Sequence, residues 1–500
     1  MNRRTFRLLF FIFIVAGLGV ISSPGQKSDP QTAVLPLTTK SAKVRHLLDE
    51  AWKLDLDQVE QTKAVDVLRR AVAIDPEFAM GHELLSQTSL DPAEQVREQN
   101  KAFATRSHAS HPEQLVIEWL QNAADHKLIP AITDMNDVLS QYPHDKWVVF
   151  LANWWLTEQT QYERAAAVYE NSGITDSPGL MNNTAYTYAY MRQFDKAFAL
   201  MDKYIAALPD DANPQDSYAE ILRMAGHFNE AIERYKAALA INPEFYSSQF
   251  GIADTYSLMG DEDRARKEYE IGFHRFRLPA LHQVQWQTRE ATTFIREGDY
   301  AGADRVFQQI ADYSHAKHMS QVEADTYRQM AMYQPDHTQA LIFLSKAEAA
   351  VKEGKNSLPA MIKQESAQIL RARVELGLKM DDKKSTRLAL ARLTEMAESS
   401  NDKLIDSAYH GATGAFLFSE HKYKDAISHL EEDINSPLSL KLLTVAYQKT
   451  GDAAEVKQTA ETLANLNDPT LEQAMIVPAF RKCYQDPACS GNLKDAALQK

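Results

Sequence analysis

Apolar and polar residues alternate along most of this chain with the spacing of amphipathic helices. Within that pattern, Ala197, Ala231 and Ala265 stand 34 residues apart. A large residue follows each alanine, and a proline follows two of them further on, at Met201, Tyr235, Tyr269, Pro209 and Pro243. An ordinary helical bundle would not keep small, large and proline positions in phase. The fixed period therefore indicates an internal repeat.

One stretch of the chain carries a family resemblance. From Gly226 to Pro243 the sequence reads GHFNEAIERYKAALAINP, which resembles the second half of the tetratricopeptide-repeat (TPR) consensus. The resemblance implies an all-α solenoid, in which helix-turn-helix units stack into a right-handed superhelix. The alanines would let the two helices of a unit approach closely, the large residues would fill the gap between units, and the prolines would end the second helix.

Weaker copies of the pattern extend in both directions. We predict a TPR array over residues 41–312 and degenerate TPR-like repeats over residues 313–468, with about ten to twelve helix pairs in total. In the degenerate part the periodicity predicts helices at 320–333, 337–352, 358–379 and 383–398.

The first 25 residues differ from the rest. Three arginines, Arg3, Arg4 and Arg7, precede an apolar run from Leu8 to Ile21, which small residues follow. This is the layout of a secretory signal, and the run is short for a membrane span. We expect residues 1–25 to be a signal peptide or, if uncleaved, an N-terminal anchor, and residues 26–40 to be a polar linker. Either alternative predicts an extracytoplasmic protein of the periplasm or cell envelope, with membrane contact only if the segment is uncleaved.

The net charge of −14 narrows the range of partners. Nucleic-acid binding requires clustered Lys and Arg, so we expect no nucleic-acid partner. An acidic surface favours basic or neutral proteins instead.

No catalytic constellation is recognisable. The chain has no P-loop and no G-x-S-x-G motif, and His82-Glu83 lacks the second histidine of a zinc motif because Ser86 takes that place. We therefore expect His82 to lie on a helix surface. The spacings His108-x-x-His111 and His315-x-x-His318 could each place two imidazoles on one helical face, but neither has a third ligand. The sequence predicts no enzyme, no metal and no cofactor; the alternative is a catalytic site within residues 313–400.

The resemblance also implies where binding would occur. In a TPR stack the first helices line a concave groove that holds an extended peptide or a partner helix. The composition at these positions is aromatic and acidic, which suits a protein or peptide partner with a basic or amide-rich segment; the alternative is a solvated surface without a ligand. The groove positions are Asn182, Tyr186, Tyr190, Asp216, Glu220, Arg223, Phe250 and Asp254.

The C-terminal tail, residues 469–500, departs from the repeat. Its prolines, Pro469, Pro478 and Pro487, are expected to interrupt any long helix. Cys483 and Cys489 are the only cysteines, and in an oxidising compartment they predict a small disulfide loop, with two ordinary thiols as the alternative.

Overall fold

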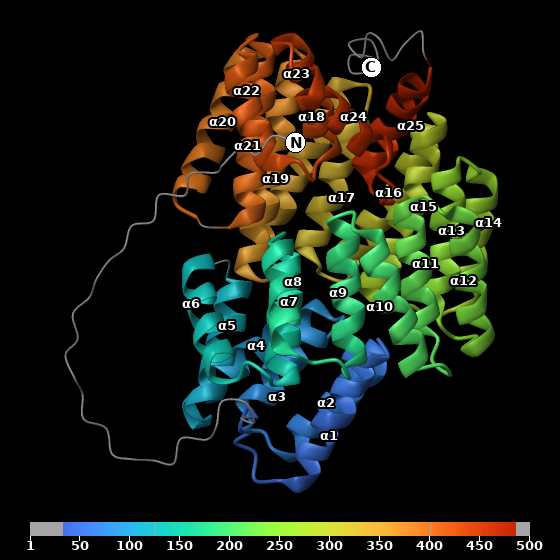
Figure 1. The fold of residues 1–500 in the computed structure, drawn as a ribbon. Coiled ribbons are helices and arrows are strands. Elements are labelled where there is room, and N and C mark those ends of the chain that lie inside the picture. Colours follow the sequence, from blue (N-terminus) through green and yellow to red (C-terminus); the bar gives the residue numbers. More distant parts are fainter. Residues whose placement is uncertain (1–33, 126, 401, 487–500) are drawn as a thin grey trace.

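The computed structural model describes residues 34–125, 127–400 and 402–486. In this part of the chain there are 25 α-helices and no β-strand. Each odd-numbered helix from α1 to α23 packs against the helix that follows it, which makes 12 pairs. The predicted all-α solenoid is confirmed (Figure 1).

The helix pairs follow one another without interruption along the chain. The first six are α1 (Ala42–Trp52) with α2 (Gln61–Ile74), α3 (Ala79–Thr88) with α4 (Pro92–Thr105), α5 (His111–Ala124) with α6 (Leu128–Gln141), α7 (Lys146–Glu158) with α8 (Tyr162–Ser172), α9 (Pro178–Tyr190) with α10 (Phe194–Ala207), and α11 (Asn213–Ala225) with α12 (Phe228–Ile241). The other six are α13 (Tyr246–Met259) with α14 (Glu262–Arg275), α15 (Ala280–Glu297) with α16 (Tyr300–Ala316), α17 (Ser320–Tyr333) with α18 (His337–Glu353), α19 (Pro359–Lys379) with α20 (Lys383–Glu398), α21 (Lys403–Ser419) with α22 (Tyr423–Leu430), and α23 (Pro437–Thr450) with α24 (Ala453–Ala464).

The small and large positions of the repeat pack as expected. Ala197, Ala231 and Ala265 are fully buried. A Cβ added at Gly251, on the first helix of the next unit, would lie 2.5 Å from the ring of Tyr235. The tyrosine therefore fills the gap between successive units, and only glycine leaves room for it there.

The four helices predicted in the degenerate middle are confirmed as α17 to α20. Local capping explains why their limits could be read from the sequence. The Asp336 side chain accepts hydrogen bonds from the backbone at the start of α18, and Asp382 does the same for α20.

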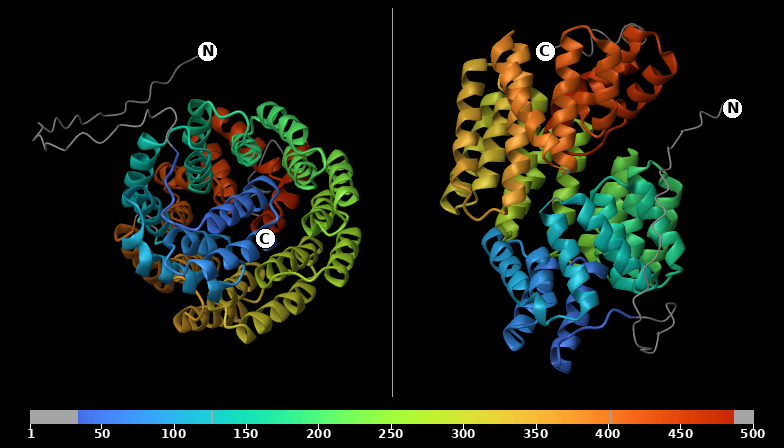
Figure 2. Two further views of the ribbon diagram at one scale, coloured as in Figure 1. Left: turned by 90° about the horizontal axis from the view of Figure 1, so that it is seen from below. Right: turned by 90° about the vertical axis from the view of Figure 1, so that its left-hand side faces the viewer.

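Stacking of the pairs curls the chain into a superhelix whose two ends reach back toward the middle. Viewed end-on, the pairs form a ring (Figure 2, left). The segment after α1, a short π-helix η1 (Lys53–Asp57), contacts α9. At the other end, α25 (Leu471–Gln485) contacts α15, α23 and α24. Leu471 and Ala474 of α25 join the same apolar core as α15 to α19.

The structure adds contacts of the predicted linker and corrects one expectation about the C-terminal tail. Residues 34–40, the described part of the predicted linker, are held against the array: Leu35 N–H donates to Asp145 Oδ2 at 2.8 Å, and Thr38 N–H donates to Glu113 Oε1 at 3.0 Å. The expectation that Pro478 interrupts the last helix is wrong, because α25 continues through it. Burial of Ile476, Val477 and Phe480 offsets the backbone hydrogen bond that proline cannot make.

Some predictions concern residues outside the described ranges. The signal segment, residues 1–25, and Cys489 are among these residues, so both the export signal and the disulfide stay predictions. Cys483 is a buried residue of α25. Across the described ranges, no helix has both the length and the apolarity that crossing a membrane requires.

Candidate interaction groove

The three first helices α9, α11 and α13 carry all eight predicted groove residues. On α9, Asn182, Tyr186 and Tyr190 recur every four residues and so share one face. The hydroxyl of Tyr186 donates to Glu220 Oε2 on α11 at 2.8 Å. Neighbouring units are thus linked through the residues that the sequence placed in the groove.

Arg223, near the end of α11, is the centre of this network. It donates to Glu220 Oε1 at 2.7 Å, to Asp254 Oδ2 at 3.4 Å and to the Tyr235 hydroxyl at 3.3 Å. Asp254 on α13 also accepts from Arg289. Burial acts to raise the pKa of Glu220, but Arg223 and Arg289 hold it below its usual value. The network therefore keeps Glu220 ionised.

Several of the predicted residues are too deeply buried to touch a ligand directly. Phe250 and Asp254 have no exposed surface, and the Phe250 ring stacks on Trp286 with centroids 4.7 Å apart. Asp216 accepts from Ser248 Oγ at 2.6 Å, and burial raises its pKa to about 7. Asn182 and Arg223 are buried as well. Tyr186 and Glu220 are half-buried, and Tyr190 is exposed.

A second set of side chains adjoins Tyr190, and we call Glu158, Tyr162, Tyr190 and Asp468 the tyrosine–acid patch. The rings of Tyr162 and Tyr190 stack with centroids 5.5 Å apart. Tyr190 is 46% exposed, yet burial is the main cause that raises its pKa, followed by Glu220, Asp468 and Glu158. Burial, Glu158 and Asp468 likewise raise the pKa of Tyr162 to about 12.

The carboxylates of the tyrosine–acid patch lack counter-ions in contact. Burial raises the pKa of Glu158, and it raises the pKa of Asp468 against the opposing positive charges of Arg223, Arg289 and Arg192. Among the ion pairs between described residues, none includes Glu158 or Asp468. The patch thus places two carboxyl groups, neither in a direct ion pair, beside two aromatic rings.

Segments from the N-terminal and the C-terminal repeats contact the helices of this groove. The loop after α24 brings Asn467 to the end of α11, where its Nδ2 donates to the Met224 carbonyl at 3.3 Å, and the same loop supplies Asp468. From the N-terminal side, the backbone N–H of Gly179 on α9 donates to Asp57 Oδ1 of η1 at 2.9 Å. Part of the concave face is therefore occupied by the chain itself.

Residues 222–285, which include α12, α13 and α14, match the family model described as tetratricopeptide repeat. The chain carries tetratricopeptide repeats. No curated protein sequence matches this TPR chain.

Solved structures resemble the TPR chain only distantly. The yeast Tom70 structure is 13% identical, with 90% of this chain and 99% of that chain covered and a TM-score of 0.39. A tetratricopeptide repeat protein from Parabacteroides merdae ATCC 43184 is 15% identical, with 55% and 94% covered and a TM-score of 0.35. The APC/C hetero-tetramer Cut9–Hcn1 is 14% identical, with 81% and 76% covered and a TM-score of 0.38. Because these TM-scores are low, the likenesses carry no weight for function.

The histidines singled out in the sequence of the TPR chain lie in other places than the sequence suggested. His82 is buried rather than on a helix surface, because its ring lies between Glu98 (Nδ1 to Oε2, 2.7 Å) and the Pro76 carbonyl (Nε2 to O, 2.9 Å). Neither histidine pair shares one helix. His108 precedes the Ser110 cap of α5, and α16 ends before His318. Within the described ranges, no three or more His, Cys, Asp or Glu residues are grouped to hold a metal ion.

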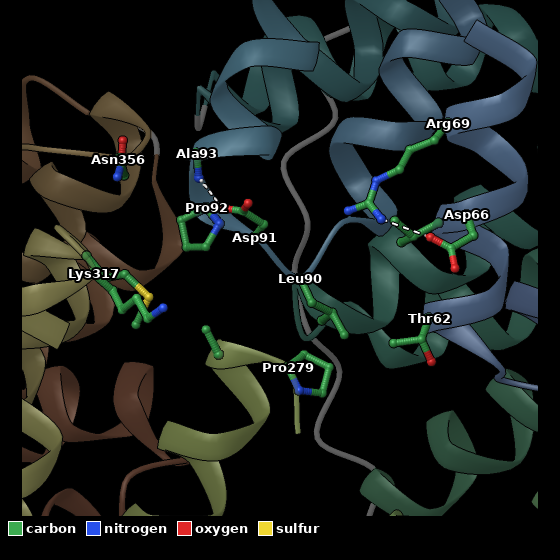
Figure 3. A pocket seen from close by; sticks show the side chains of 13 residues that line it. Thr62, Asp66, Arg69, Leu90, Asp91, Pro92, Ala93, Pro279, Lys317 and Asn356 are labelled. Atoms are coloured by element: carbon green, nitrogen blue, oxygen red, sulfur yellow. Dashed lines mark hydrogen bonds and ion pairs between the residues drawn. The ribbon is translucent and has the colours of Figure 1, made fainter. Parts of the chain in front are cut away.

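A cavity of about 380 Å³ lies where the N-terminal repeats of the TPR chain approach later ones (Figure 3). Its wall is formed by α2 and by the loops before α4, α15, α17 and α19. Two polar residues of the cavity wall stabilise the local structure. Arg69 forms an ion pair with Glu94 at 2.7 Å, and the Asp91 side chain caps α4. We infer that this cavity is the space left where two turns of the superhelix come together.

Of the tyrosine–acid patch, the sequence predicted Tyr190 but not Glu158, Tyr162 or Asp468. Tyr162 begins α8, the second helix of a repeat unit that matches the TPR consensus only weakly. An aromatic residue beside Glu163 and Arg164 was a weak indication of a contact site. Asp468 could not have been found, since it reaches the groove only through the fold-back of the C-terminal segment.

Proposed function

We propose that this TPR chain is an exported, non-enzymatic scaffold or adaptor that binds a protein or peptide partner on its concave face. The observation that carries the proposal is the tyrosine–acid patch, where two stacked tyrosines, one of them 46% exposed, adjoin two carboxyl groups that form no direct ion pair. TPR repeats in general serve protein interaction, and this patch supplies chemistry for recognition.

The chemistry of the patch favours a basic segment of the partner. A Lys or Arg side chain would gain cation–π attraction from Tyr162 and Tyr190 and would neutralise Glu158 and Asp468. An acidic segment would meet repulsion at the same place. The tyrosine–acid patch is thus the place where we propose that the basic partner suggested by the sequence makes contact.

Peptide binding tests this proposal. Fluorescence anisotropy would compare a labelled Lys/Arg-rich peptide with a Glu/Asp-rich peptide of equal length. We expect the basic peptide to bind and the acidic one not to bind. We expect Tyr190→Ala and Glu158→Gln each to weaken binding by about 1 kcal/mol, about fivefold.

A matched control is available in Tyr300, which is also exposed and also stacks on a tyrosine, Tyr333, at 5.9 Å. Tyr300→Ala should leave peptide binding unchanged. Equal binding of both peptides, or an undiminished affinity of Tyr190→Ala, would rule out the patch as the contact point.

Export is the second part of the proposal and rests on the arginines and apolar run of residues 1–25. Fusion of residues 1–40 to a reporter that is active only after export would test it. We expect activity from this fusion and none when Leu8 to Ile21 is interrupted by two lysines. Inactivity of the unaltered fusion would contradict export.

The enzyme alternative in residues 313–400 has less support. Most of the segment lies in the helices α17 to α20, and several of its buried charged residues are in ion pairs. Arg328 Nε lies 2.8 Å from Glu365 Oε1, and burial raises the pKa of Glu365 to about 8. This pair lies between packed helices, where it serves the fold.

A further inference from the structure

We propose that His410 and His429 form a binding site for a divalent transition-metal ion, of which Cu²⁺ and Ni²⁺ fit best. His410 lies on α21 and His429 on α22, the two helices of one repeat unit. Their Nδ1 atoms face each other at 3.0 Å. Both side chains are half-buried, so the site is reachable from solvent.

The outer nitrogen of His410 faces a carboxylate. His410 Nε2 lies 3.4 Å from Asp406 Oδ1, one helical turn earlier on α21. A carboxylate beside the outer nitrogen favours the tautomer with its proton on Nε2, the arrangement that usually supports a metal-binding histidine. In that tautomer the Nδ1 lone pair of His410 faces His429.

The distance between the two nitrogens suits a chelated ion. With metal–nitrogen bonds of about 2.0–2.1 Å, a separation of 3.0 Å gives a nitrogen–metal–nitrogen angle of about 91–97°. This is close to the right angle of square-planar or octahedral Cu²⁺ and Ni²⁺. Tetrahedral Zn²⁺ would need the nitrogens about 3.3–3.4 Å apart.

The ring orientation agrees with this geometry. The ring centroids are 4.9 Å apart and the planes are inclined by 39°. A straight N–H···N bond would hold the centroids farther apart at the same nitrogen separation. The rings are therefore inclined to the line that joins the nitrogens, as chelation requires.

The surroundings of the pair favour a cation. Asp425 and Glu432 lie close enough to act on His429 and add negative charge around the pair. Tyr409 packs edge-on against both rings, with centroids 5.1 and 5.8 Å away. With two protein ligands, water must complete the coordination.

Two measurements test the site on the full chain. Isothermal titration with Ni²⁺ should show one ion per chain, and His410→Ala and His429→Ala should each weaken that binding by about tenfold or more. Asp406→Asn, which alters only the positioning residue, should weaken it by about tenfold. His421→Ala is the matched control: His421 is an exposed histidine beside α22 and should be dispensable.

Spectroscopy of the unaltered protein tests the site without relying on variants, which could lose binding because they unfold. The electron paramagnetic resonance spectrum of bound Cu²⁺ should show coupling to two imidazole nitrogens. Coupling to a single nitrogen, or Ni²⁺ binding equally reduced by His421→Ala, would mean scattered surface binding only and would overturn the proposal. Undiminished Ni²⁺ binding by folded His410→Ala would overturn it as well.

Discussion

The side chain of Asn467 reaches across 243 residues of sequence to the Met224 carbonyl, where its Nδ2 donates a hydrogen bond of 3.3 Å. This contact joins the loop after the last helix pair to the end of α11 in the middle of the array. In a simple solenoid each repeat unit contacts only the units next to it in the sequence. The C-terminal segment departs from that rule and links repeat units that are far apart in the sequence.

The first prediction concerns Arg481, which holds that loop in place. Its guanidinium donates to the Ala464 carbonyl at 2.7 Å, to the Leu466 carbonyl at 3.2 Å and to Asn467 Oδ1 at 2.8 Å. Arg481→Ala should lower the free energy of unfolding by about 2 kcal/mol, as urea denaturation would measure. Lys482→Ala removes an exposed neighbour and should change little. Equal stability of the two variants would show that the loop is not held by Arg481.

The second prediction concerns Gly179 at the start of α9. A Cβ at this position would lie 2.4 Å from the Leu56 carbonyl oxygen, so only glycine allows η1 to approach so closely. Gly179→Ala should therefore separate η1 from α9. Hydrogen exchange would detect faster exchange in residues 42–60, while α20, far along the chain, serves as the internal control. Unchanged protection of residues 42–60 would contradict this contact.

The fold could be predicted from the sequence because its determinants are local. Helix periodicity and turn residues such as Asp336 and Asp382 lie within each helix pair, so even the poorly matching repeats α17 to α20 were located correctly. The groove could be predicted only in part. Helical spacing placed Tyr186 and Tyr190 on one face, but the burial of Phe250 and Asp254 depends on the neighbouring units. The approach of Asp468 depends on the fold-back.

The third prediction concerns the buried charge of Arg223. This side chain is 2% exposed and pairs with Glu220 and Asp254. Arg223→Ala removes positive charge that compensates those two carboxylates. It should lower the free energy of unfolding by about 3–5 kcal/mol, as thermal or urea unfolding would measure. Lys236→Ala breaks an exposed pair with Glu233 and should cost less than about 1 kcal/mol. A cost for Arg223→Ala as small as that of the control would mean that the network does not stabilise the groove.

The last prediction concerns pH and Glu83 on α3. This carboxyl is fully buried and accepts only from two amides, Gln87 at 2.9 Å and Gln121 at 3.3 Å. Burial raises its pKa from 4.5 to about 7. The folded state therefore binds more protons than the unfolded state between those values. The contribution of the Glu83 carboxyl to the free energy of unfolding is fully present below pH 4.5 and is lost as the pH rises toward 7.

Glu83→Gln should remove this dependence, because an amide carries no charge. Its Oε1 can accept from one of the two glutamines, and rotation of the other glutamine's amide lets that oxygen accept from the new NH2 group. The substitution should raise the free energy of unfolding at pH 8 by about 2–3 kcal/mol and leave it nearly unchanged at pH 4.5. Thermal unfolding across this pH range would measure the difference between the variant and the unaltered protein. Glu244→Gln, at an exposed loop position, should give a difference that is flat with pH. A similarly flat difference for Glu83→Gln would show that Glu83 ionises as freely in the folded chain as in the unfolded one.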